Sequence, residues 1–375
     1  MGRSQVEEMK TDTIRLPDKR AIDTKVYEEE IRPWLPPEII DCHVHIGLEE
    51  HCGPVSEERR KEIWAIEVGL HQTWEELRNS HRTLFPDRQV QSLVFGNVYR
   101  EADIESGNAY VLNGALDPRN DAEALLVTRP EWNPKVVAEA ISVGFVGIKP
   151  YPDLVAQGMN EAAIYDFVPR GHLSVLNQLS GILMLHLPRP GRLADPQNIR
   201  DLLEISEQYP SIKMIVAHIG RAYCLPTARL GLPYLAERDG IYFDLSANLN
   251  TDVFEYAIEM VGPERLLFGS DLPVMMIRGQ REHFDDKYVN YTNGPYSWNV
   301  NRKDPEEESR YTFYVYEQLR ALIKAVTRLG LGREAMEKML YSNSKSLLDR
   351  SSNDRLQVAR SATVGLRNAF RARSH

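Results

Sequence analysis

Residues 39–46 read Ile-Ile-Asp-Cys-His-Val-His-Ile, an apolar run with two histidines set one residue apart near its end. Successive side chains of a β-strand point to opposite faces, so His43 and His45 should lie together on one face. Cys42 should then point to the other face and serve as buried packing. Two neighbouring imidazoles at a strand end are a ready pair of metal ligands. An isolated pair of this kind is equally well read as two unrelated histidines.

Seven more apolar runs follow, each short enough to be a strand. Continuous apolar runs are what a parallel strand buried on both faces requires. Helix-like segments such as 133–142 and 196–208 separate the runs, and this alternation builds parallel βα units. Eight units in 375 residues predict an α/β fold, a (β/α)8 TIM barrel. The expected strands are 39–46, 90–98, 124–129, 143–149, 181–187, 213–219, 241–247 and 266–271.

The third strand has a competitor, because residues 109–116 could also be extended. A crossover between parallel strands needs about a dozen residues or more, and only about ten separate Val98 from that run. We therefore predict a helix over 100–116 and the strand over 124–129.

The chain divides into an N-terminal arm (1–38), the barrel (39–348) and a basic C-terminal tail (349–375). Terminal helices are expected over 305–328 and 333–348. Two long insertions, 49–85 and 275–303, follow strands one and eight and should lie at the C-terminal mouth of the barrel. The first should contain a helix near 56–82, and its histidines should be solvated; they are His51, His71 and His81.

Composition indicates which classes of partner and which cellular compartment to expect. The formal net charge is −9, which argues against nucleic acid or an anionic membrane as the partner. Three cysteines without a CxxC spacing favour a reducing compartment. The first residues are polar, and no stretch approaches the roughly 18 to 20 apolar residues that span a bilayer. We expect a cytoplasmic protein.

Further polar side chains close other apolar runs. His186 ends the fifth run, His218 the sixth and Asp271 the eighth. In a parallel barrel the C-terminal ends of all strands reach one mouth, so these side chains should meet His43 and His45 there. A polar group at the end of a buried strand is costly without a partner. The coincidence favours a shared site over unrelated structural roles.

These residues make the sequence resemble the amidohydrolase superfamily, in particular the amidohydrolase-related branch that includes aminocarboxymuconate semialdehyde decarboxylase and related hydrolases. The resemblance runs from about Ile39 to Leu348. It implies that His43, His45, His186 and Asp271 bind one divalent metal ion, commonly Zn²⁺. It also implies that His218 sits beside the metal as a catalytic or water-orienting group. The motifs that carry it are DCHVH, VGFVGIKPYPD, LMLHL, VAHIG, FGSDLP and YSNSKSLL.

Basic residues near these strand ends are candidates for binding a substrate anion. Lys149 ends the fourth run, and three interpretations stay open: an anion-binding group, a structural charge paired with an acid, or a carboxylated bridge between two metals as in binuclear relatives. Among the arginines that follow strands, Arg189 and Arg221 rank first, because each lies three residues past a predicted site histidine. An arginine binds a carboxylate through a bidentate fork.

The leading hypothesis is a metal-dependent hydrolase. Zn²⁺ lowers the pKa of a bound water toward about 7, Asp271 can accept that proton, and the metal or His218 can polarise the carbonyl of an amide or lactone. A non-oxidative decarboxylase could use the same site, with Asp271 or His218 protonating the carbon that loses CO₂. A barrel that binds a small molecule without chemistry is the third reading. The expected partner is a small molecule that could be anionic, and a homo-oligomer stays open.

Overall fold

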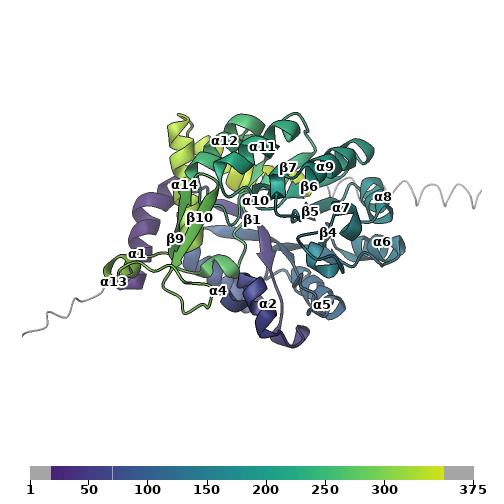
Figure 1. Cartoon of the computed structure of the whole chain (residues 1–375), viewed down its shortest axis with the longest axis horizontal. Coiled ribbons are helices and arrows are strands. Elements are labelled where there is room, and N and C mark those ends of the chain that lie inside the picture. Colours follow the sequence, from purple (N-terminus) through teal and green to yellow (C-terminus); the bar gives the residue numbers. More distant parts are fainter. Residues whose placement is uncertain (1–17, 70, 350–375) are drawn as a thin grey trace, which may run out of the picture.

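A computed structural model describes residues 18–69 and 71–349 of the chain. At its centre eight parallel strands pair in sequence order from the first to the eighth, and helices surround them (Figure 1). The (β/α)8 prediction is confirmed. The strands are β1 (Glu38–His45), β2 (Gln89–Phe95), β3 (Ala122–Thr128), β4 (Gly147–Pro150), β5 (Ile182–Leu185), β6 (Lys213–Val216), β7 (Ile241–Asp244) and β8 (Leu266–Leu267).

The barrel is closed by backbone hydrogen bonds between β1 and the residues that follow β8. The amide of Cys42 donates to the carbonyl of Phe268 over 2.9 Å, and the amide of Asp271 donates to the carbonyl of His43 over 2.8 Å. The amide of His45 then donates to the carbonyl of Leu272 over 2.9 Å. This seam places Asp271 directly beside the two histidines of β1.

Helices and short turns connect the strands. The predicted helix over 133–142 is present with Asn133 as its N-cap, and the third strand lies where the crossover argument put it. The connecting helices are α5 (Ile104–Ala115), α6 (Pro134–Val143), α7 (Ile164–Phe167), α8 (Arg170–Leu179), α9 (Pro196–Gln208), α10 (His218–Arg221), α11 (Leu225–Leu235) and α12 (Thr251–Val261). The short turns are η3 (Glu49–His51), η4 (Pro152–Leu154), η5 (Arg192–Ala194), η6 (Pro263–Arg265) and η7 (Val274–Met276).

The first insertion differs from the single helix expected near 56–82. It contains α2 (Glu57–Glu62), α3 (Trp64–Val68) and α4 (Trp74–Leu84). The backbone of Ile63 is extended, and Gly69 has a φ of 141°, a conformation that favours glycine. Thr73 then starts α4 through a capping box with Glu76. These local breaks outweigh the helical periodicity of the segment.

The second insertion contains a hairpin of β9 (Gly279–Phe284) and β10 (Lys287–Thr292), which pair antiparallel. The predicted helix over 305–328 is two helices, α13 (Pro305–Ser309) and α14 (Tyr314–Arg328). The backbone between them pairs with Arg278 at the base of the hairpin, because Phe313 and Arg278 form a β-bridge. After α14 come α15 (Arg333–Glu337) and the π-helical turn η8 (Lys338–Ser342), and residues 343–349 continue as α-helix, which agrees with the helix predicted over 333–348.

The described part of the N-terminal arm lies on the barrel. It contains α1 (Lys19–Val26), the π-helical turn η1 (Tyr27–Ile31) and η2 (Arg32–Trp34). Ile31 and Leu35 are buried in the main core. The division of the chain at residues 38 and 349 stays a prediction, and the basic tail lies outside the described residues. Among the described helices none is long and apolar enough to cross a bilayer.

Gly147 in β4 sets how closely two strands approach. A Cβ atom built there would lie 2.0 Å from the carbonyl oxygen of Ile182 in β5. We expect Gly147→Ala to lower the free energy of unfolding by about 1–3 kcal/mol, because backbone cannot yield as a flexible side chain does. Gly107→Ala is the control, since no atom lies within 4 Å of its built Cβ. Chemical denaturation measures both variants, and equal stabilities would contradict the close approach.

Candidate metal centre and active site

The predicted site residues meet at the barrel mouth. A cavity of about 240 Å³ opens there. Its wall includes every residue that the strand-end argument singled out, namely His43, His45, His186, His218 and Asp271. Chain segments separated by more than two hundred residues thus share one cavity.

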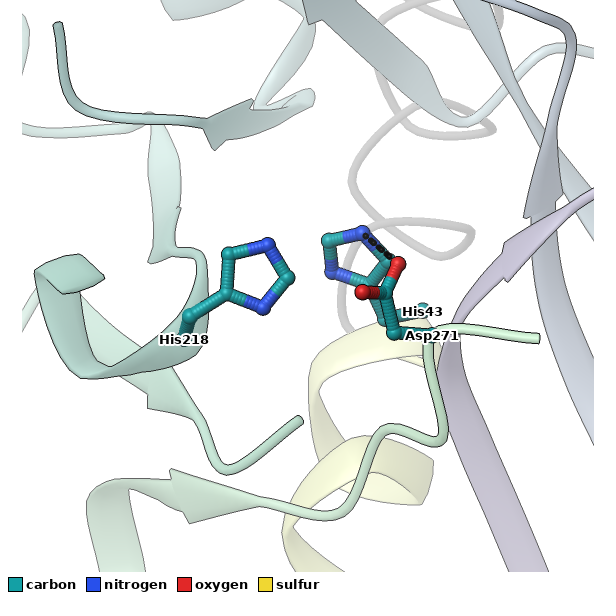
Figure 2. Close-up of side chains that lie close together, drawn as sticks. All are labelled: His43, His218 and Asp271. Atoms are coloured by element: carbon teal, nitrogen blue, oxygen red, sulfur yellow. Dashed lines mark ion pairs between the residues drawn. The ribbon is translucent and has the colours of Figure 1, made fainter. Parts of the chain in front are cut away.

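Asp271 lies at the centre of this group. Its Oδ1 atom is 3.5 Å from His43 Nε2 and 3.4 Å from His45 Nε2. The ring centroids of His43 and His218 are 4.7 Å apart, and His186 lies beyond, with its ring centroid 5.2 Å from that of His218. Figure 2 shows the carboxylate of Asp271 beside the ring of His43, with the ring of His218 on the other side of His43 in this view.

Three of these side chains form a compact donor set. One ligand atom from each of His43, His218 and Asp271 lies within 4.8 Å of the other two, and all three residues are buried. His45 joins the set through its contact with Asp271. His186 lies beside His218 on the same cavity wall. The geometry therefore brings all five predicted side chains to one cavity.

A buried carboxylate that the sequence argument missed orients two of the imidazoles. Asp244, at the end of β7, accepts a hydrogen bond from His43 Nδ1 over 2.9 Å at Oδ2. Its Oδ1 accepts from the amide of His218 over 3.1 Å, from the amide of Ser246 over 3.0 Å and from the Ser246 hydroxyl. Burial alone would raise the pKa of Asp244, but the His43 contacts and the Ser246 hydrogen bond lower it below the usual range.

This arrangement determines which ring nitrogens carry protons. Because a carboxylate only accepts, His43 must carry its proton on Nδ1, which leaves the Nε2 lone pair facing Asp271. The Ser246 hydroxyl gives its one proton to Asp244, so its Oγ atom accepts from His218 Nδ1 over 2.8 Å. His218 therefore also presents an unprotonated Nε2 atom. Both rings are set as acceptors, the state that a metal ligand or a general base needs.

Burial keeps the remaining imidazoles neutral. It lowers the pKa of His45, and it lowers the pKa of His186 well below the usual value, with Arg221 and His218 adding to the effect. Burial also lowers the pKa of His218 to about 4, although Asp271 opposes it. Burial raises the pKa of Asp271, but the His45 hydrogen bond and the neighbouring imidazoles bring it below its usual value. An ionised carboxylate beside neutral imidazoles is a suitable ligand set for a divalent cation.

The backbone turns sharply where it presents these groups. His218, Ile219 and Arg221 have φ values of 57°, 49° and 63°, and Asp271 has a φ of 59°. Non-glycine residues adopt this left-handed region at a cost of about 1 kcal/mol each or more. The turns follow β6 and β8, and His218, Arg221 and Asp271 line the cavity.

Asp41 is a second buried carboxylate that the sequence argument did not select, and it supports the seam between β1 and the residues after β8. Asp41 accepts hydrogen bonds from the amide of Ser270 over 2.8 Å and from its hydroxyl, and His81 Nε2 lies 3.3 Å away. His81 is buried on α4, so its expected solvation is wrong. The aspartate of the DCHVH motif was the available signal, because it lies on the same face of β1 as His43. Asp41 thus positions Ser270, the neighbour of Asp271, and Asp244 positions His43 and His218.

Lys149 is buried and is not among the residues that line the cavity. Its side chain is fully buried, and its Nζ atom is 4.7 Å from the ring centroid of Phe95. Within the described residues Nζ has no hydrogen-bond partner. Burial lowers its pKa to about 8, while the charges of Asp244 and Asp271 oppose the shift. None of the three interpretations of Lys149 is decided by these contacts, and its role in substrate binding stays a prediction.

The two predicted arginines, Arg189 and Arg221, lie in different places in the structure. Arg221 lines the cavity. Arg189 lies outside the cavity wall, where its guanidinium contacts Asp195 over 3.2 Å and the carbonyl of Glu161 over 3.1 Å. Two further arginines line the cavity: Arg192 and Arg281. Arg281 was missed because it belongs to the hairpin of the second insertion, whose position depends on tertiary packing.

Comparison with known proteins agrees with this architecture. A family model described as amidohydrolase matches residues 40–350, which is most of the chain. The chain belongs to the amidohydrolase 2 family. The family match spans all eight strands and both insertions, and it begins at β1, which carries the paired histidines. No curated protein matches the chain significantly.

Solved structures similar to this amidohydrolase share its fold. A probable 2-pyrone-4,6-dicarboxylic acid hydrolase from Acinetobacter baumannii with citric acid bound has a TM-score of 0.54 and 16% identity, over 83% of this chain and 99% of that one. A 4-oxalomesaconate hydratase from Rhodopseudomonas palustris has a TM-score of 0.51 and 14% sequence identity, over 88% of this chain and 99% of that one. A dihydroxybenzoic acid decarboxylase from Polaromonas sp. JS666 with bound manganese and the inhibitor 2-nitroresorcinol has a TM-score of 0.50 and 13% sequence identity, over 84% of this chain and 97% of that one. At these identities the likeness extends to the fold alone.

The amidohydrolase 2 family is metal-dependent, and the residues present here fit a divalent ion. The donors are buried imidazoles and an ionised carboxylate, within the spacing that one cation can bridge. The rings of His43 and His218 are held by outer hydrogen bonds, which is the usual support of metal-binding histidines.

Asp244→Asn should weaken metal binding about 10- to 100-fold, because an amide cannot accept from His43, His218 and Ser246 together. Competition with a chromogenic chelator measures the affinity. Asp239→Asn, at an exposed aspartate outside the site, is the matched control and should bind metal as the parent protein does. A folded Asp244→Asn protein with unaltered affinity would refute the supporting role of this carboxylate.

Proposed function

We propose that this amidohydrolase is a hydrolase that uses one divalent metal ion, Zn²⁺, on an amide, lactone or related carbonyl substrate. His43, His45, His186 and Asp271 would hold the ion, and His218, which belongs to the same compact donor set, would stand beside it as the catalytic or water-orienting group. The observation that carries the proposal is the meeting of imidazole Nε2 atoms with the Asp271 carboxylate at the barrel mouth. When bound, such an ion supplies Lewis-acid polarisation of the substrate carbonyl.

Asp271 and His218 are the groups of the protein that can transfer protons in this reaction. Asp271 directs Oδ1 toward His43 and His45, so its other oxygen is the one available to accept a proton from water. His218 presents an unprotonated Nε2 atom and can orient the same water. Because its Nδ1–H is committed to Ser246, His218 can donate to a substrate oxygen only after it has first accepted a proton. His218 is therefore a base at the start of the reaction.

Decarboxylation is the alternative use of the same groups. It is supported by the Polaromonas protein, which is named a decarboxylase, whereas the Acinetobacter protein is named a hydrolase. A carboxy-lyase needs an acid that protonates the carbon from which CO₂ departs. Asp271 or His218 could deliver that proton after taking it from solvent. We place hydrolysis first, because the tautomer derived for His218 makes it a proton acceptor.

The two reactions differ in their products. We expect a screen of lactones and amides with metal-loaded protein to yield ring-opened or cleaved acids without CO₂. Mass spectrometry detects the added water, and a coupled carboxylase assay detects CO₂. Release of CO₂ in proportion to substrate loss would favour the decarboxylase, and no product from either substrate class in the presence of Zn²⁺ or Mn²⁺ would remove support for hydrolysis.

His186→Ala should strip the metal and abolish turnover, because it deletes one of the proposed ligands. Elemental analysis of the purified variant measures the metal content. His71→Ala is the control, since this histidine is exposed and lies outside the cavity wall. Stoichiometric metal in the His186→Ala protein would count against His186 as a ligand, while the rest of the donor set would stand.

A further inference from the structure

Three arginines line the same cavity as the histidine and aspartate cluster. Arg192 begins η5, Arg221 ends α10, and Arg281 lies in β9. They come from three separate connections, after β5, β6 and β8. No single stretch of sequence reveals the group, because only the folded barrel brings these connections together.

Aromatic rings hold two of the three guanidinium groups in place. The Cζ atom of Arg192 lies 5.3 Å from the ring centroid of Tyr223, and that of Arg281 lies 5.0 Å from the same ring. Arg281 also stacks on Tyr288, 4.7 Å from its centroid. Stacking positions an arginine while leaving the edge of its fork available for a ligand.

The hydrogen bonds of these arginines go to neutral oxygens. Arg192 Nη1 donates to the carbonyl of Arg221 over 3.5 Å, and Arg221 Nη1 donates to the carbonyl of Leu187 over 3.1 Å. Arg281 donates from Nη1 to the carbonyl of Ala247 over 2.7 Å and from Nε to the Asn290 side chain over 2.8 Å. The Nη2 atom of each guanidinium takes part in none of these bonds.

Carboxylates do not neutralise the group. Within residues 18–69 and 71–349, no ion pair joins any of the three arginines to an acid. Glu62 also lines the cavity, but it pairs with Arg59 over 2.8 Å. Elsewhere in the same structure Arg59 satisfies its charge with Glu101 and Asp153, so unpaired arginines are not the rule for this protein.

Such a concentration of positive charge is unfavourable by itself. Burial lowers the pKa of Arg221, and the neighbouring Arg192 lowers it further, while nearby tyrosines oppose the shift. Taking cations from water costs free energy unless an opposite charge compensates them. Since the described protein groups supply no such charge, a bound anion is the natural source.

We propose that Arg192, Arg221 and Arg281 form an anion subsite for the non-reacting end of the substrate. The ligand group is a carboxylate or phosphate, whose oxygens match the guanidinium fork. The inference rests on the proposed function in that the reacting carbonyl lies toward Asp271. The substrate is accordingly an organic acid that carries negative charge away from the bond that changes. Arg281 makes the hairpin of the second insertion part of substrate selection.

Calorimetric titration of the full-length, zinc-loaded protein tests this subsite without turnover. The probes are glutarate, its uncharged analogue glutaramide, and inorganic phosphate. We expect glutarate or phosphate to bind at least about tenfold tighter than glutaramide, because a hydrogen bond to a charged group is stronger than one to a neutral amide. The stronger of the two anions identifies the group that the substrate carries.

Arg281→Gln should weaken binding of the preferred anion about tenfold and leave the metal content unchanged. Arg281→Lys keeps the charge and loses the fork, so its loss should be smaller. Arg200→Gln on α9 is the control, because this exposed arginine lies outside the cavity and bonds to Gln197. Arg221→Gln provides a second variant, should Arg281→Gln fail to fold.

Equal binding of glutarate and glutaramide, or unchanged anion binding in folded Arg281→Gln and Arg221→Gln, would overturn the subsite. These results are separable from the proposed function. Arginine-dependent anion binding in a protein that hydrolyses none of its substrates would leave the subsite standing and overturn the hydrolase. Efficient turnover of neutral lactones without anion binding would do the reverse.

Discussion

The site depends on one buried negative charge, the carboxylate of Asp244. This group is fully excluded from solvent and satisfies four donors, from His43, His218 and Ser246. A buried ion is tolerated only when its hydrogen bonds are complete, so each of these donors is held where the carboxylate needs it. The orientation and protonation of two imidazoles follow from this requirement.

Much of this arrangement is accessible from sequence because it follows from periodicity. The alternation of residues in β1 places His43 and His45 on one face, and the parallel barrel brings the other strand ends to the same mouth. Asp244 escaped the argument because the seventh run was taken to extend to residue 247, so the aspartate lay inside the strand and not at its end. The observed strand ends at Asp244, where the same strand-end rule would have selected it.

Other features depend on tertiary packing and leave no periodic signal. His81 lies on a helix of the first insertion and reaches Asp41 only because α4 packs beside β1. Arg281 belongs to a hairpin whose base is bound to the N-terminal arm through Arg278 and Asp23. Contacts between such distant segments set which face of the hairpin meets the cavity. The two halves of the cavity therefore differ in origin: β1 and the residues just after other strands supply the histidines and Asp271, and the connections supply the arginines.

The closing seam of the barrel has a consequence for synthesis of the protein. The donors on β1 are made early, whereas Asp271 and the backbone that pairs with β1 follow more than two hundred residues later. A nascent chain that ends before Asp271 carries the two histidines of β1 but lacks the carboxylate that lies beside them in the folded protein. The proposed donor set is therefore complete only in polypeptides that extend past the eighth strand.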